Sequence, residues 1–227
     1  MATSGTTAFA PDFTEIAEEA WEQAGREMRS GYDLRTARRS MNLLTIEWQN
    51  RGINLWTIAS GTEALLADTA TYNLPTDTID LLEQTIRTGT GTSQSDLTIS
   101  RMSASEYATL PNKNTTGRPT KVWINRQIAL PTVTFWPIPS ASSTYTFAYW
   151  YLRRMEDAGN GVETPDIPFR FLPALIAGLA VRIAMKVPEL TPRVEMLKGA
   201  YEEAFRFATE EDRVKTPSRF VPRRSHI

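Results

Sequence analysis

Nucleophiles and metal ligands are scarce among the residues of this chain that could do chemistry. The sequence has 227 residues, no cysteine and one histidine, so a thiolate zinc site, a disulfide framework and a cysteine nucleophile are excluded. The histidine, His226, is the penultimate residue. Because a catalytic triad needs a histidine that is held by packing and by a second hydrogen bond, we expect no catalytic role for His226.

Paired carboxylates are the remaining candidates for acid-base chemistry. The pairs Glu202/Glu203 and Asp157/Glu163 could serve a cell-wall hydrolase, but such catalysis needs both acids in one pocket. Most acids here recur at helical spacing, which is typical of solvated or ion-paired helix faces. The Gly89-Thr90-Gly91 segment lacks the third glycine and the following helix of a phosphate-binding loop. We therefore predict no enzyme, no cofactor and no metal site, with a hydrolase as one alternative.

The segment from Arg213 to Ile227 is basic and contains no acid. Its lysine and arginines could bind nucleic-acid phosphates with release of counterions, which makes a nucleic-acid-binding module the second alternative. The same composition suits a segment that becomes ordered in a groove of a protein partner, or a solvated terminus. Aromatic residues near Phe147 to Tyr151 could stack on bases, but their bulk on both strand faces favours a strand that is covered on both sides.

Two amphipathic helices are predicted near the N-terminus. Asp12 and Glu15 form a capping-box pattern, and Gly25 fits the end of the first helix. The apolar positions of this helix recur at helical spacing. The opposite face is acidic and carries Glu15, Glu18, Glu19 and Glu22.

The second helix is expected to begin after Asp33 as its cap and to end at Gly52. Its apolar residues from Leu34 to Trp48 form one core stripe. A second stripe, on another face, consists of Arg35, Arg39, Leu43 and Ile46. Arginine beside apolar residues is enriched in protein interfaces. This stripe could pair with the acidic face of the first helix within one subunit. It could also pair between subunits, in a heterologous contact of the kind that closes into rings.

The middle of the chain changes to threonine, glycine and proline, with strands expected near 69–75, 78–88, 95–102, 118–127, 130–139 and 143–155. Their close succession favours an antiparallel sheet, and Ser103 with Glu106 predicts one short helix. Two helices follow. The first, near 168–187, is apolar on nearly all sides, which implies burial. The second should begin at Thr191-Pro192 and end near Val214.

The predicted fold class is α+β: a helical bundle from the N- and C-terminal helices, a central antiparallel β-rich insertion and an extended C-terminal tail. The expected divisions are a flexible N-terminus (1–11), an αα-hairpin (12–56), a β-rich domain (57–155), the C-terminal helices (156–214) and the tail (215–227). No membrane segment is expected, because the longest apolar run, 171–181, is shorter than the roughly 20 residues that span a bilayer. The net charge of −1 gives no global preference for nucleic acid.

Several segments resemble, in the same order, the head-to-tail adaptor proteins of short-tailed bacteriophages, also called tail tubular protein A or packaged-DNA stabilisation proteins. The resemblance covers residues 13–222. Its most specific parts are residues 35–56, the Gly117-Arg118-Pro119 turn, and Pro165-Asp166-Ile167-Pro168 before the apolar helix.

This resemblance implies a non-enzymatic virion protein at the head-tail junction, assembled in the cytoplasm of the host bacterium. The family members form a dodecameric ring beneath the portal protein, through which double-stranded DNA passes, and they carry the tail nozzle or tail fibre protein. The ring contacts expected here are Glu15, Glu18, Glu22, Arg35, Arg39, Leu43 and Ile46. The portal-docking residues implied by the family's C-terminal extension are Arg213, Lys215, Arg219, Phe220, Val221, Arg223, Arg224 and Ile227.

Overall fold

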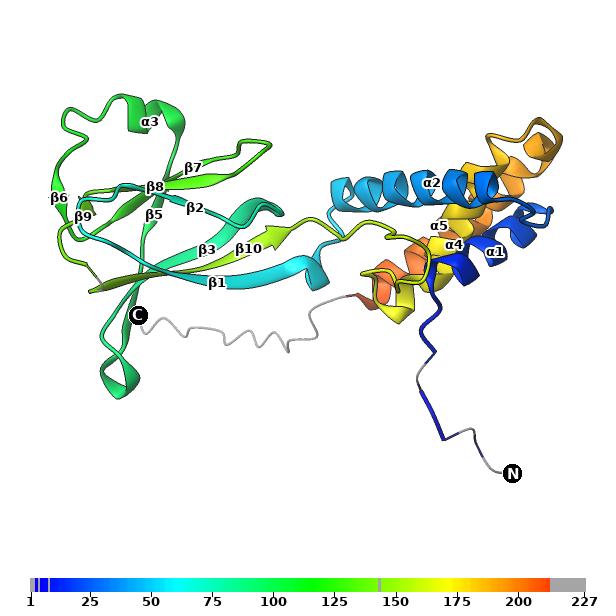
Figure 1. Cartoon of the computed structure of the whole chain (residues 1–227), viewed down its shortest axis with the longest axis horizontal. Helices are drawn as coiled ribbons and strands as arrows, with labels where there is room; N and C mark the ends of the chain where they lie inside the picture. Colours follow the sequence, from blue (N-terminus) through cyan, green and yellow to red (C-terminus); the bar gives the residue numbers. More distant parts are fainter. Residues whose placement is uncertain (1–2, 4, 8, 143, 213–227) are drawn as a thin grey trace, which may run out of the picture. The chain divides into compact units, whose positions relative to one another are not determined.

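A computed structural model of the chain describes residues 3, 5–7, 9–142 and 144–212 (Figure 1). The chain divides into two compact units. One, the helical unit, combines Met1–Ile53 with Glu156–Ile227, and the other, the β unit, is Asn54–Met155. Together they contain helices and mostly antiparallel sheets, which confirms the predicted α+β class.

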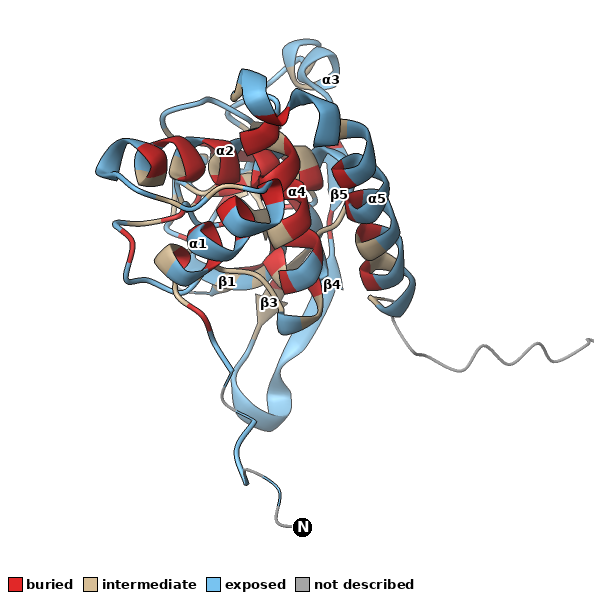
Figure 2. Cartoon of the chain, turned by 90° about the vertical axis from the view of Figure 1, so that its right-hand side faces the viewer, coloured by how far each residue is buried: buried red, intermediate tan, exposed pale blue. Residues whose placement is uncertain are grey.

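In its described residues, the helical unit has four α-helices: α1 (Phe13–Ala24), α2 (Gly31–Asn50), α4 (Leu172–Ala184) and α5 (Val194–Glu211). Short 3-10 helices, Phe169–Phe171 and Pro188–Arg193, precede α4 and α5. The other three helices pack around α4, which Figure 2 shows as buried along most of its length. Ten of its residues are buried, so the prediction that this apolar helix is covered on several sides is confirmed.

The N-terminal helix has the predicted cap. The Asp12 carboxylate accepts a hydrogen bond from the Glu15 amide at 2.9 Å, and Glu15 accepts one from the Asp12 amide at 3.1 Å. Gly25 ends the helix with a φ of 102°, a left-handed conformation that glycine adopts without a steric penalty. Every residue of the predicted apolar stripe is buried.

The start of α2 differs from the prediction. Its N-cap is Ser30, whose hydroxyl accepts a hydrogen bond from the Asp33 amide at 3.3 Å. Asp33 already lies inside the first turn, where its carboxylate accepts from the Arg29 amide at 3.2 Å. The prediction of Asp33 as the cap is therefore wrong, because Ser30 reaches the free amides of the first turn from an earlier position.

The start of α5 also differs. Thr191 and Pro192 belong to the 3-10 helix Pro188–Arg193, which continues directly into α5 at Val194 without a side-chain cap. The prediction that Thr191 caps the last helix is wrong, because the helical conformation begins before it. The helix ends at Glu211.

The β unit contains two four-stranded sheets. The first has the order β1 (Ile58–Ala64), β10 (Tyr145–Arg153), β3 (Thr78–Thr88) and β4 (Ser95–Thr98), all antiparallel. The second has the order β2 (Thr71–Asn73), β8 (Thr132–Trp136), β7 (Lys121–Asn125) and β5 (Ser100–Met102). Side chains from both sheets form one core, in which Phe135 contacts Phe147 edge to face.

Two strand pairs depart from the antiparallel prediction. β5 lies parallel to β7, and β6 (Thr116–Gly117) lies parallel to β9 (Ile138–Pro139). The short helix α3 (Ala104–Ala108) separates β5 from β6 along the chain, and it carries the predicted Ser103–Glu106 capping box. The connection through α3 gives the chain enough length to return in the same direction.

The aromatic strand β10 is fully covered on one face and only partly covered on the other, where Ala148 is buried. Phe147, Tyr149 and Tyr151 are buried in the core, whereas Trp150, on the other face, is 44% exposed. The prediction that this strand is covered on both sides is therefore wrong for Trp150.

Candidate functional site

The outer face of α2 carries the residues that the sequence singled out for assembly. Arg35, Arg39, Leu43 and Ile46 are all exposed, with Leu43 at 53% and Ile46 at 52%. Tyr32, 65% exposed, extends the row by one turn. The row lies opposite the buried residues of α2, because both rows follow the helical period. We call Tyr32, Arg35, Arg39, Leu43 and Ile46 the α2 stripe.

The surface beside the α2 stripe carries an excess of positive charge. A groove of about 610 Å³ is lined by three basic residues, Arg26, Arg39 and Lys186, and by two acids, Asp33 and Glu189. The Lys186 ammonium donates a hydrogen bond to the Ser40 hydroxyl at 2.6 Å. Burial lowers the pKa of Lys186, and the positive charges of Arg39 and Arg182 lower it further. An acidic partner would relieve this repulsion.

The acidic face of α1 is exposed as predicted, but two of its residues already have partners, because Glu19 accepts a hydrogen bond from the Gln23 amide group at 3.0 Å. Glu15 is part of the helix cap, whereas Glu18 and Glu22 extend from the surface. Among the described residues, no ion pair joins these three glutamates to Arg35 or Arg39, so the pairing within one subunit is absent there. Whether they contact another subunit stays a prediction.

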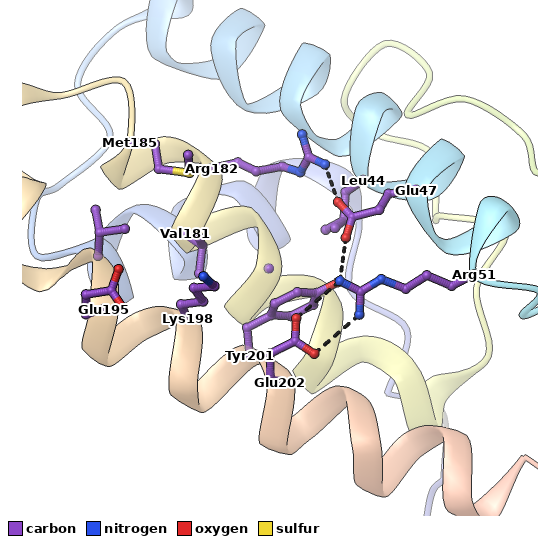
Figure 3. A pocket seen from close by; sticks show the side chains of 12 residues that line it. Leu44, Glu47, Arg51, Val181, Arg182, Met185, Glu195, Lys198, Tyr201 and Glu202 are labelled. Atoms are coloured by element: carbon purple, nitrogen blue, oxygen red, sulfur yellow. Dashed lines mark hydrogen bonds and ion pairs between the residues drawn. The ribbon is translucent and has the colours of Figure 1, made fainter.

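A charged network attaches α2 to its neighbours (Figure 3). The Glu47 carboxylate forms ion pairs with Arg182 of α4 and with Arg51. The distance from the Arg51 guanidinium to Glu47 is 2.7 Å. Arg51 also reaches Glu202 of α5 at 3.2 Å. Below these groups, the Trp48 indole donates a hydrogen bond to the Tyr201 hydroxyl at 3.0 Å. These contacts hold α2 in place and thereby orient the α2 stripe outward.

The groove in Figure 3 does not have the features of a catalytic site. It has a volume of about 350 Å³, an apolar floor that includes Leu44 and Val181, and a charged rim. Glu47 and Glu202, two acids of this rim, are bonded to arginines. Both carboxylates are therefore engaged in ion pairs that hold the helices together.

Of the first carboxylate pair proposed for a hydrolase, Glu202 is ion-paired and Glu203 is exposed. In the second pair, both acids accept hydrogen bonds from nearby backbone amides. Asp157 accepts a hydrogen bond from the Gly159 amide at 2.9 Å. Glu163 accepts from the amides of Asn160 and Gly161 at 2.7 and 3.0 Å. These amide hydrogen bonds, Asn160 foremost, lower the pKa of Glu163, which is the opposite of what a general acid requires.

In the part of the chain that the structure describes, no group of three or more histidine, aspartate or glutamate side chains could hold a metal ion. No helix within residues 9–142 or 144–212 is long and apolar enough to cross a membrane.

The portal-docking residues lie outside the described residues. They are Arg213, Lys215, Arg219, Phe220, Val221, Arg223, Arg224 and Ile227. Their role stays a prediction.

Sequence reasoning missed a second exposed row, on α5. It consists of residues opposite the buried Leu197, Tyr201 and Phe205. Met196 and Phe207 in this row are 61% and 55% exposed. We call Met196, Gly199, Glu203, Phe207 and Glu210 the α5 stripe. The helical spacing that predicted the buried face of α5 could also have predicted this exposed row, if the same period had been applied to the opposite face.

The comparisons with known proteins agree with the virion role that the resemblance implied. A family model described as SU10 adaptor protein matches residues 11–223, which cover the β unit and most of the helical unit. No curated protein matches the chain. Because the family match covers most of the chain, it confirms the resemblance to phage adaptors. The chain belongs to the SU10 adaptor protein family, whose members are structural proteins of the bacteriophage head-tail junction.

Proposed function

We propose that copies of this chain form a ring that joins the portal to the tail nozzle or tail fibre protein and extends the DNA channel. The observation that carries the proposal is the α2 stripe, which places two half-exposed aliphatic residues beside two exposed arginines. A monomer gains nothing from leaving these aliphatic groups in water, since burial of apolar surface contributes about 25 cal/mol per Å². A contact with a second copy would bury them.

Ring closure follows from the kind of contact. The α2 stripe is basic and apolar, so it does not complement itself and needs a different surface on the next copy. Such heterologous contacts repeat around an axis and close into rings when the rotation permits. The copy number of twelve comes from the family resemblance.

Docking to the portal is proposed for the segment from Arg213 to Ile227. Its five basic residues, without an acid, suit an acidic groove, and Phe220, Val221 and Ile227 add apolar anchors. The net charge of −1 suits a channel through which DNA must move, because many contacts to phosphates would retain it. Assembly in the host cytoplasm before DNA ejection belongs to the same proposal.

The portal contact is tested by deletion of residues 215–227. The full chain and the shortened chain are each mixed with the cognate portal protein and sedimented through a gradient. We expect the full chain to travel with the portal and the shortened chain to lose at least about tenfold in affinity, because its proposed anchors are removed. Circular dichroism verifies that the shortened chain is folded. Equal sedimentation of both chains with the portal would show that the docking residues lie elsewhere.

The nucleic-acid alternative makes a different prediction for the same two proteins. If the basic segment binds phosphates, a mobility shift with double-stranded DNA should weaken steeply between about 50 and 200 mM salt. We expect no comparable shift with DNA, and a portal complex that persists at the higher salt concentration because apolar contacts contribute to it.

A further inference from the structure

The α2 stripe has a chemically matched counterpart on the same chain. We infer that the α2 stripe of one copy packs side by side, in parallel, against the α5 stripe of the next copy, with Arg39 opposite Glu203 and Leu43 opposite Phe207. This inference rests on the proposed ring and names the contact that closes it.

The two stripes have the same spacing. In both, successive members are three, four, four and three residues apart. On helices of equal rise, two rows with equal intervals remain aligned over their whole length. Aligned in parallel, the first member of each row lies beside the first member of the other, and Arg39 and Glu203 form the central pair.

The aligned pairs are chemically compatible. Arg39 and Glu203 have opposite charges, and Leu43 and Phe207 are both half-exposed apolar residues. Tyr32 lies opposite Met196, and thioether contacts with aromatic rings are favourable.

The remaining two pairs can also be accommodated. Arg35 lies opposite Gly199, where a side chain would meet no atom within 4 Å, so this position has room for an arginine. Ile46 lies opposite Glu210, whose methylene groups can cover it while the carboxylate stays in water.

The stripes face away from each other within one copy. The buried faces of α2 and α5 meet, because Trp48 contacts Tyr201 through a hydrogen bond and Phe205 through a ring contact at 5.7 Å. Each stripe lies opposite its own buried face, so the two stripes lie on different outer sides of the helical unit. This arrangement is what a heterologous contact requires.

The directions of the two helices favour the parallel alignment. Figure 1 shows that α2 and α5 run in the same general direction along the helical unit. A rotation between neighbouring copies of a twelve-membered ring changes a direction by at most about 30°. The α5 helix of one copy therefore still runs in the same general direction as the α2 helix of the next, and not antiparallel to it.

The acidic face of α1 is a poorer counterpart than the α5 stripe. Glu18 and Glu22 would satisfy the arginines, but the exposed positions of α1 hold no large apolar side chain. Leu43 and Ile46 would then remain in water. The α5 stripe supplies both the acid and the apolar cover. Its five members include no basic residue, although the neighbouring Arg206 guanidinium lies over the Phe207 ring at 5.2 Å.

Disulfide trapping tests the inference directly, because the chain has no cysteine of its own. The double variant Leu43→Cys/Phe207→Cys is assembled with the cognate portal protein and oxidised mildly. We expect a ladder of covalent oligomers on a non-reducing gel. Each single variant should give no ladder, and a mixture of the two single variants should stop at covalent dimers.

The outcomes separate the possible contacts. A ladder from Leu43→Cys/Glu18→Cys, without one from Leu43→Cys/Phe207→Cys, would show that the α2 stripe contacts α1 of the next copy and not α5. That result would overturn the inference but would still agree with the proposed ring. Covalent dimers from Leu43→Cys alone would show a two-fold contact and overturn the inference. A ring seen by electron microscopy without any of these cross-links would assign the α2 stripe to another partner. The absence of any ring would overturn both proposals.

A charge exchange provides an independent measurement. We expect Arg39→Glu and Glu203→Arg each to weaken ring assembly by about tenfold or more, because like charges then oppose each other. The combination of both should recover assembly to within about threefold of the original protein, since the pair is restored with reversed signs. Lys198→Glu, an exposed charge reversal on α5 outside the stripe, is the matched control. Failure of the double variant to recover would contradict the Arg39–Glu203 pair.

Discussion

At the scale of single residues, Gly178 determines how closely the helices of the bundle approach. A β-carbon at this position would lie 2.8 Å from Cε2 of Tyr201 and 2.9 Å from Cδ2 of Leu44. Both neighbours are held in the core, because Leu44 is buried and Tyr201 carries the hydrogen bond from Trp48. The contact between α2, α4 and α5 therefore depends on the absence of a side chain at position 178.

We expect Gly178→Ala to lower the free energy of unfolding by about 1–2 kcal/mol. Overpacking costs about 1–3 kcal/mol, and the better helix propensity of alanine offsets up to about 1 kcal/mol of it. Urea denaturation followed by circular dichroism measures the effect. The control is Gly199→Ala, which has open space and should be neutral or stabilising. Equal effects of the two substitutions would contradict the proposed role of Gly178.

At the scale of elements, the hydrogen bond from Trp48 to Tyr201 links α2 to α5 inside the bundle. Removal of the hydroxyl by Tyr201→Phe leaves a buried indole donor without its acceptor, which should cost about 1–3 kcal/mol at neutral pH. The same substitution gives a prediction for alkaline pH.

Burial raises the pKa of Tyr201 above its ordinary value of 10.0, although the hydrogen bond with Trp48 acts in the opposite direction. Above that pH the unfolded chain releases the phenol proton while the folded chain retains it, so stability falls as pH rises. We expect Tyr201→Phe to lose less stability than the original protein between about pH 9 and pH 11. Parallel losses in the two proteins would show that Tyr201 does not contribute to the alkaline transition.

Local sequence patterns predicted the positions of the helices more accurately than the residues at which the helices begin. The period of apolar residues identified α1 and the two faces of α2, because burial of one face is a property of the helix itself. The caps of α2 and α5 were placed wrongly, since Ser30 caps α2 from three residues before Asp33 and the 3-10 helix before α5 has no strong sequence signal.

Pairing between distant segments limited the prediction of the β unit and of the site. The strand β1 contains a glycine and shows little alternation of apolar and polar residues. Its strand conformation is stabilised by its pairing with β10. The parallel pairing of β5 with β7 likewise depends on contacts between segments distant in the sequence, which local patterns do not predict. The α2 stripe was predictable, but the contribution of Lys186 to its positive surroundings required the folded chain, because α4 brings that residue beside Ser40.

At the scale of the whole molecule, the chain combines a helical unit from its two ends with a β unit from its middle. The helical unit carries exposed stripes on two of its helices, and each is held outward by a buried face on the same helix. A structural role needs such surfaces rather than a pocket with a reactive group. The membership in the SU10 adaptor protein family places this arrangement at the head-tail junction of a phage.

The most direct test of the account is electron microscopy of the cognate portal protein with and without the full chain. We predict an added ring beneath the portal, with twelve copies around a continuous central channel. Portal particles that carry no added density, or isolated copies that never contact one another around the axis, would contradict the account.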